Sequence, residues 1–232
     1  MKLTYWEMDY IHSRMKNYDI KFQEIYNELF DHIVTAIEEK RAAGDTNSLE
    51  RMYADIVKIQ FGGYSGIEKI AKSHEAGYRA KVRKMILTNF RYYINLRSLV
   101  LIIALMCIGF SLPHTNLIIG IFFIAIFAAA AYSSLYAYIK LRAIKPKGGK
   151  LSLVYSHTIA QANFPLIFLN ALLWVPQLPN IFSDHYKFKL TNVYYPVVLA
   201  LMLAFMIIYS LSCIRLCRQE LKQVVNINPG AI

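Results

Sequence analysis

Two groups of polar side chains in this chain have residue types and spacings that could do chemistry. The first lies in the stretch YNELFDHI, where a carboxylate and an imidazole stand one helical turn apart at Glu28 and His32, with Asp31 between them. At about 100° per residue, Glu28 and His32 share one edge of a helix while Asp31 points to solvent. His12 could join them only if its own helix packs antiparallel. Because two ligands do not make a metal site, we interpret Glu28, Asp31 and His32 as a partner-binding or structural motif and assign no metal.

The second group lies in an apolar stretch near Pro165. On a helix, His157 and Gln161 fall on one side, and Asn163 and Asn170 share nearly the opposite side. Polar groups at membrane depth are costly unless they pair or face a cavity, so both sides need partners and the helix should lie centrally. One interpretation is an intramembrane site for a small ligand or a proton. We favour interhelical hydrogen bonds. The expected donors are Tyr132, Ser133, Ser134, Tyr209, Ser210 and Ser212.

Signatures of soluble enzymes are missing from the sequence. There is no GxSxG, no HExxH and no CxxC pair, and Gly62-Gly63 lacks the Lys-Ser/Thr that completes a phosphate-binding loop. The three cysteines, Cys107, Cys213 and Cys217, lie in or beside apolar segments and imply no disulfide framework. We therefore expect no catalytic residue, no cofactor and no enzymatic activity.

The elements that position the second group are membrane spans. Leu117 to Tyr138 has no charged residue in about 22 positions, which as a helix covers roughly 33 Å, more than the roughly 30 Å of a hydrocarbon core. Similar segments predict four transmembrane helices in all. Their expected ranges are about 96–113, 117–139, 151–178 and 192–214.

The charge balance separates two halves of the chain. Up to Arg97 there are 16 Lys or Arg against 13 Asp or Glu, and beyond it 10 against 2, so most of the net charge of +11 belongs to the apolar half. This favours anchoring to anionic lipid, not nucleic-acid binding. Basic residues crowd the approach to the first span, the loop after the second and the C-terminal tail. The positive-inside rule then predicts that both termini are cytoplasmic.

The first half predicts a small helical domain. Apolar residues recur at helical spacing in a first helix over about 1–18 and in a second from an N-cap at Asp19 to about Arg41. A third helix, capped by Asn47 or Ser48, should stop at Gly62-Gly63. A fourth pattern opens at Ser65, and we expect its helix to continue unbroken into the first span. The predicted domains are a cytoplasmic helical domain, 1–93, and a transmembrane domain, 94–232.

The order of residues in the second and third helices resembles a known family. Tyr26, Glu28-Leu29, Asp31-His32-Ile33 and Ile37-Glu38, followed by an apolar helix ending in Phe61-Gly62-Gly63, are similar to the EL-x-DH pattern of HAAS-type helical domains. The resemblance covers about Asp19 to Ile70. It implies a small cytoplasmic bundle preceding the spans of a bacterial membrane protein, often encoded beside PadR-like regulators, and it implies no catalytic residues.

These patterns together predict an all-α protein, with a small cytoplasmic helical bundle followed by a four-helix transmembrane bundle. The expected function is sensory or regulatory: the bundle binds a protein partner and is coupled to the spans in the bacterial inner membrane. The alternative is a small permease or a transporter accessory subunit with a polar path along the third span. The expected partners are the lipid bilayer and a cytoplasmic or membrane protein, with no direct nucleic acid, and a homo-oligomer is left open.

Overall fold

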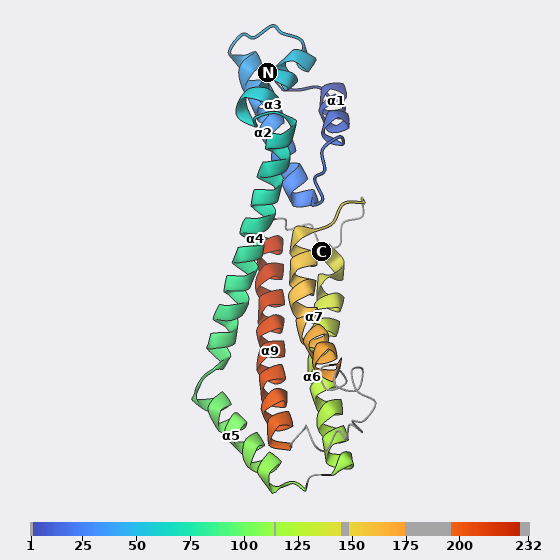
Figure 1. The fold of residues 1–232 in the computed structure, drawn as a ribbon. Coiled ribbons are helices and arrows are strands. Elements are labelled where there is room, and N and C mark those ends of the chain that lie inside the picture. The colour runs from blue at the N-terminus through green and yellow to red at the C-terminus, as the bar shows by residue number, and fades with distance from the viewer. Residues whose placement is uncertain (1, 114, 145–148, 175–195, 228–232) are drawn as a thin grey trace, which may run out of the picture. The chain divides into compact units, whose positions relative to one another are not determined.

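The computed structural model describes residues 2–113, 115–144, 149–174 and 196–227. Within these ranges the chain is helical and contains no strand, so the all-α prediction is confirmed (Figure 1). One isolated parallel bridge pairs Phe22 with Leu151. The elements are α1 (Tyr5–Met15), α2 (Gln23–Ala42), α3 (Leu49–Gln60), α4 (Tyr64–Tyr93), α5 (Leu96–Ser111), α6 (Asn116–Leu141), the 3₁₀ turn η1 (Arg142–Ile144), α7 (Leu153–Trp174) and α9 (Pro196–Ile227).

Contacts divide the chain into two units. The N-terminal unit comprises Met1–Lys81 together with Lys145–Leu153, and the apolar unit comprises Val82–Ile144 and Val154–Ile232. This division by contacts falls inside α4, and it assigns the segment before α7 to the N-terminal unit. The chain passes between the units at three points.

The core of the N-terminal unit is built on the apolar face of α2. Ile25, Leu29, Ile33 and Ile37 recur at three- or four-residue spacing and are each at most 3% exposed, as the periodicity predicts. The predicted cap of α3 is also present, because the backbone N–H of Arg51 donates to Ser48 Oγ over 3.4 Å. The stop after α3 uses two glycines, Gly62 and Gly63, with φ of 71° and 78°.

The start of α2 differs from the expectation. Asp19 is not its N-cap, since α2 begins at Gln23 and Phe22 occupies the cap position in extended conformation. The physical reason is a contact from a distant part of the chain: Leu151 N–H donates to Lys21 O and Gln23 N–H donates to Leu151 O, over 3.0 and 2.9 Å. This pairing holds the residues before Gln23 extended and postpones the helix.

The helix expected to run unbroken from Ser65 into the first span is interrupted, so that expectation is wrong. The fourth helix ends at Tyr93, and a new one begins at Leu96 at an angle of 72°. Asn95 and Ser98 form a reciprocal cap: Ser98 N–H donates to Asn95 Oδ1 and Asn95 N–H donates to Ser98 Oγ, over 3.1 and 2.9 Å. Such a cap satisfies the free N–H groups of a new helix and so favours a restart there.

In the apolar unit, α6 carries no charged residue before Lys140 and has a buried and an exposed face. Along α6, the buried stripe includes Ile119 and Ile126, which are at most 2% exposed. The opposite stripe carries large side chains that are 57–74% exposed: Leu117, Ile121, Ile124 and Phe127. A surface of this kind is strongly unfavourable in water and suits contact with lipid.

The helices of the apolar unit alternate in direction. Ile119 and Phe122 of α6 cluster with Leu199 of α9, and Leu141 at the other end of α6 clusters with Cys217, so α6 and α9 are parallel. Contacts at Ala162 and Leu169 place α7 antiparallel to both. The antiparallel α5 meets α9 where Gly109 lies against Val197. The central helix is therefore α9, which contacts α5, α6 and α7, and not the third predicted span.

By length and composition, two helices, α6 and α9, could cross a membrane, and the bent pair of α4 and α5 would make a third within the described residues. The fourth expected crossing is not among them. It corresponds to α7, which carries the polar group around Gln161. Positions 175–178 and 192–195 of the predicted spans lie outside the described residues.

Candidate functional site

A groove in the N-terminal unit contains two of the three residues of the YNELFDHI motif. It lies between α2 and the first half of α4, closed by the end of α3, with a volume of about 440 Å³. Leu29, Ala36, Phe61 and Ile70 give it an apolar floor. Its rim is polar and consists of Glu28, His32, Thr35, Glu39, Gln60 and His74. We call it the α2–α4 groove.

The rim carries an ion pair that the sequence did not reveal. His74 Nδ1 lies 3.2 Å from Glu28 Oε2, and both side chains are between 42 and 49% exposed. The pair is charged only when the imidazole is protonated. Because it is exposed, its contribution to stability is small, about 0–1 kcal/mol, and both groups stay accessible to a partner.

The other residues proposed for this site lie elsewhere. Asp31 is exposed and points away from the groove, as expected. The first helix does pack antiparallel on α2, but His12 does not join Glu28 and His32. Instead, Tyr26 Oη lies 2.7 Å from His12 Nδ1. In the described residues no group of three metal-binding side chains comes together.

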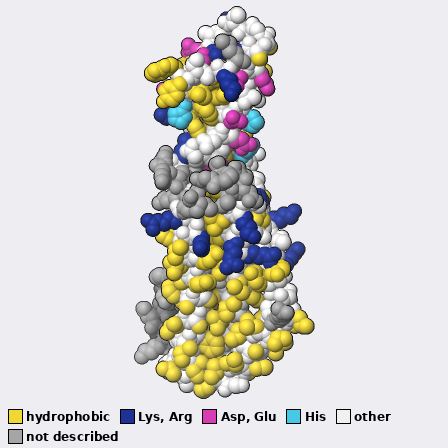
Figure 2. Space-filling view, turned by 180° about the vertical axis from the view of Figure 1, so that it is seen from behind, with side chains coloured by type: hydrophobic (Ala, Val, Ile, Leu, Met, Phe, Trp, Pro, Cys, Tyr) yellow, Lys and Arg dark blue, Asp and Glu magenta, His cyan; other side chains and the backbone are white. Residues whose placement is uncertain are grey.

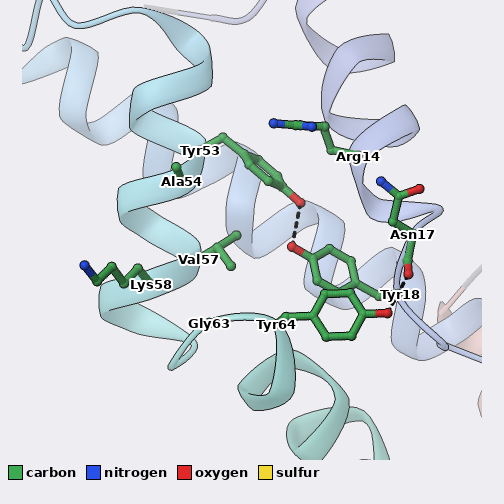
Figure 3. Close-up of a pocket in the computed structure, with 9 residues that line it drawn as sticks. All are labelled: Arg14, Asn17, Tyr18, Tyr53, Ala54, Val57, Lys58, Gly63 and Tyr64. Carbon is green, nitrogen blue, oxygen red and sulfur yellow. Dashed lines mark hydrogen bonds between the residues drawn. The ribbon is translucent and has the colours of Figure 1, made fainter.

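A second pocket, of about 420 Å³, lies between α1, α3 and the start of α4 (Figure 3). Three tyrosines dominate it. Tyr53 Oη donates to Tyr18 Oη over 3.2 Å, and Tyr64 Oη donates to the carbonyl of Asn17 over 2.7 Å. Burial raises the pKa of Tyr53, which keeps its phenol neutral. These bonds tie the turn after α1 to α3 and α4, so we assign them to packing.

The polar group of α7 is organised around Pro165. Proline has no N–H, so the carbonyl of Gln161, four residues earlier, loses its partner within α7. Two side chains of α9 replace it: Tyr209 Oη lies 3.4 Å and Cys213 Sγ 3.6 Å from that oxygen. The Gln161 side chain also accepts from Tyr209, at 3.4 Å.

The next carbonyl of α7 is satisfied from the other side. Ser133 and Ser134 of α6 both donate to the carbonyl of Ala162, over 3.2 and 2.9 Å. Three of the predicted donors therefore contact the turn of α7 before Pro165, and Ser210 donates instead to Ala129 of α6 over 2.6 Å. The acceptors are mainly backbone carbonyls of α7, and these hydrogen bonds join α7 to its two neighbours.

The remaining polar residues of α7 are not gathered into one cluster. His157 and Asn163 are half-buried, and Asn170 is exposed on the outside of the unit. A transport path along this helix would require Gln161 to face an open channel, whereas its oxygens face Tyr209. The structure thus brings Gln161 to α9 but does not unite the four residues.

Basic side chains collect at one end of the apolar unit. Figure 2 shows Lys and Arg side chains in a band beside a largely hydrophobic surface. Contacts place the basic ends of the helices together: Asn89 Nδ2 donates to Gln219 over 2.8 Å, Arg215 lies 3.7 Å from the ring of Tyr92, and Arg218 donates to Tyr136 over 3.1 Å. The exposed Lys and Arg side chains described in the apolar unit are Arg83, Lys84, Arg91, Lys140, Arg142, Arg218 and Lys222.

No family model, no curated protein and no solved structure matches this chain.

Proposed function

We propose that this chain is a sensory or regulatory protein of the bacterial inner membrane, in which the N-terminal unit is cytoplasmic and binds a protein partner. The observation that carries the proposal is the α2–α4 groove: an apolar floor with an accessible rim of carboxylates and imidazoles, formed around the motif that resembles HAAS-type domains. The apolar unit anchors this binding module. The proposal assigns no catalytic residue.

Four membrane crossings agree best with the arrangement of the apolar unit. Its helices α5, α6, α7 and α9 alternate in direction, and α7, at 22 residues, is about 33 Å long. Its carbonyls near Pro165 are satisfied by α6 and α9, which offsets the cost of a polar span. With the basic ends of α6 and α9 together, the positive-inside rule puts both termini in the cytoplasm.

The groove fits a helix or loop that presents apolar side chains flanked by polar ones. Its floor supplies the hydrophobic area on which affinity depends, and its rim supplies groups for orientation. This assignment predicts that Glu28 and His32, which line the groove, contribute to partner binding, whereas Asp31 does not contribute directly.

Site-specific photocrosslinking tests the proposal. A photoreactive residue at Thr35, on the rim, is introduced into the full chain in native membranes, with Arg51 on the exposed face of α3 as the control position. We expect a crosslinked protein from position 35 only. Its yield should fall at least about fivefold in Glu28→Ala and His32→Ala, and stay within twofold in Asp31→Ala.

Equal crosslinking from both positions, or a crosslinking yield that is unchanged in Glu28→Ala and His32→Ala, would show that the groove is not the binding surface. Normal protein abundance in the membrane, measured for each variant, excludes misfolding as the cause of a lost crosslink.

A further inference from the structure

The five residues before and at the start of α7 are built into the N-terminal unit. We call residues 149–153 the strap. It begins at Gly149, whose φ of 85° permits the turn into the contact. Leu151 lies opposite Phe22 in a parallel bridge, because its N–H donates to Lys21 and its carbonyl accepts from Gln23. Ser152 is 2% exposed, and Leu153 is 7% exposed and belongs to the hydrophobic core of the unit.

A single carboxylate joins the first turns of two helices. Glu24 lies in the first turn of α2, and its Oε2 accepts the N–H of Leu153, the first residue of α7, over 2.8 Å. Its Oε1 accepts the hydroxyl of Ser152 over 2.6 Å. A carboxylate at a helix start satisfies a free N–H and complements the helix dipole. The cap of α7 is therefore supplied by another helix, 129 residues earlier in the chain.

A lysine fastens the other end of the strap. Lys150 Nζ donates to the carbonyl of Ile20 over 2.6 Å and lies 4.6 Å from the centre of the Tyr26 ring. Burial lowers the pKa of Lys150, while the nearby Asp19 acts in the opposite direction. A lysine that only contacted lipid headgroups would keep its ammonium group in water. Here the ammonium is partly withdrawn from solvent to make a defined contact.

The strap connects α7 to the groove-bearing helix α2. It leads without a break into α7, a single helix with Pro165 in its interior. Its contacts are with Phe22, the cap of α2, and with Glu24 and Tyr26 in the first turn of α2, and they lie two to six positions before Glu28 on the groove rim. A displacement at the start of α7 would therefore break the hydrogen bonds that Glu24 and Ile20 make with the strap, and these bonds hold the first turn of α2.

We propose that the strap is a latch, closed by Glu24 and Lys150, whose release frees the first turn of α2 and weakens binding at the α2–α4 groove. The latch itself follows from the contacts above, and its effect on binding rests on the proposed function.

The test uses the full chain in lipid nanodiscs and two releasing variants. Glu24→Gln removes the charge that accepts from Ser152 and Leu153, and Lys150→Met keeps the apolar stem over Tyr26 but removes the ammonium. Glu50→Gln is the matched control, because it removes a carboxylate from an exposed pair with Arg14 on another helix. Amide hydrogen exchange at Gln23, Leu151 and Leu153 reports the strap.

In the natural sequence these three amides should be protected. Glu24→Gln should speed exchange at Leu151 and Leu153 by about tenfold to a hundredfold, as loss of charge-assisted hydrogen bonds implies, and Glu50→Gln should leave it unchanged. Lys150→Met should act in the same direction. Unprotected strap amides in the natural sequence, or equal rates in all variants, would overturn the latch.

Photocrosslinking from position 35 separates the two claims. A yield that falls in both releasing variants, and not in Glu50→Gln, supports regulation by the latch. If exchange shows an open strap while the crosslink persists, regulation is overturned and the proposed function stands. If the natural sequence gives no groove-dependent crosslink, the proposed function fails and regulation fails with it, while the exchange rates still decide the latch.

Discussion

Replacing Gly66 with alanine should open the end of the N-terminal unit that holds the groove. A Cβ at position 66 would lie 1.6 Å from the carbonyl oxygen of Phe61, and real Cβ contacts are essentially never under 3.0 Å. To relieve this clash, the backbone must shift by about 1.4 Å, because a backbone carbonyl cannot rotate away as a side chain would. The turn that must move is held by Gly63 N–H donating to Val57 O and by Gly66 and Ile67 N–H donating to Gly63 O.

The expected cost follows from what the shift breaks. One or two of these hydrogen bonds contribute about 0.5–1.5 kcal/mol each. Moving Phe61 from the groove floor loses part of the roughly 1.5–3 kcal/mol of its burial. We expect Gly66→Ala to destabilise the unit by about 2–4 kcal/mol. Gly77→Ala is the matched control on the same helix: a Cβ there meets nothing within 4 Å, so it should stabilise by up to about 1 kcal/mol.

Native-state amide exchange on the full chain is the appropriate assay, because two units need not unfold in one transition. Amides of α3, such as those of Tyr53 and Ile56, should exchange about 30-fold to several hundredfold faster in Gly66→Ala, and somewhat more slowly in Gly77→Ala. If both variants change exchange in the same direction and by similar factors, Gly66 does not approach Phe61 this closely, and our account of the groove floor is refuted.

Two further predictions concern an ion pair and a helix contact. The Arg41 guanidinium holds the pKa of Glu7 at about 2, below its usual 4.5, so the stabilisation from this pair is complete above about pH 4.5 and is lost as the pH falls toward 2. Glu7→Gln should destabilise the packing of α1 by about 1–2 kcal/mol at pH 7 and have little effect near pH 2. Amide exchange of α1 measured across that pH range tests this. A difference that does not change with pH would show that the pair of Glu7 and Arg41 is not the cause. In the apolar unit, a Cβ on Gly109 would lie 2.8 Å from the backbone of Val197. Gly109→Ala should therefore lower the free energy of unfolding in detergent by about 1–3 kcal/mol, whereas Gly120→Ala should not. Equal stability of the two variants would exclude the close packing of α5 on α9.

Local patterns in the sequence were sufficient to predict features that depend on the residues of one helix alone. The face of α2 and the cap at Ser48 follow from periodicity and from a side chain three residues away. The restart at Leu96 was also within reach, because Asn95 and Ser98 have cap spacing, but the apolar residues beyond them suggested a continuous span. A capping signal inside a long hydrophobic pattern should therefore be given more weight.

Long-range contacts could not be predicted in the same way. Asp19 has every local property of an N-cap, yet the backbone before Gln23 is held extended by Leu151, about 130 positions later. Glu24 looks like an ordinary acidic residue in the first turn of α2 and proves to cap α7 instead. Nothing in the spacing of either segment distinguishes these roles, since each depends on which two parts of the chain meet.

For the polar residues of α7, prediction from the side chains alone identified donors on neighbouring helices but not their acceptors. The donors Ser133, Ser134 and Tyr209 were expected from the sequence, and all three contact α7, but mainly at the carbonyls of Gln161 and Ala162. The cause is Pro165, which has no N–H and therefore leaves the carbonyl of Gln161 without its partner within α7. A buried carbonyl left without a hydrogen bond costs several kcal/mol. A proline inside an apolar helix therefore creates a demand for hydrogen-bond donors on neighbouring helices. In this protein the hydroxyl groups of α6 and α9 meet that demand, and these hydrogen bonds join α7 to both helices.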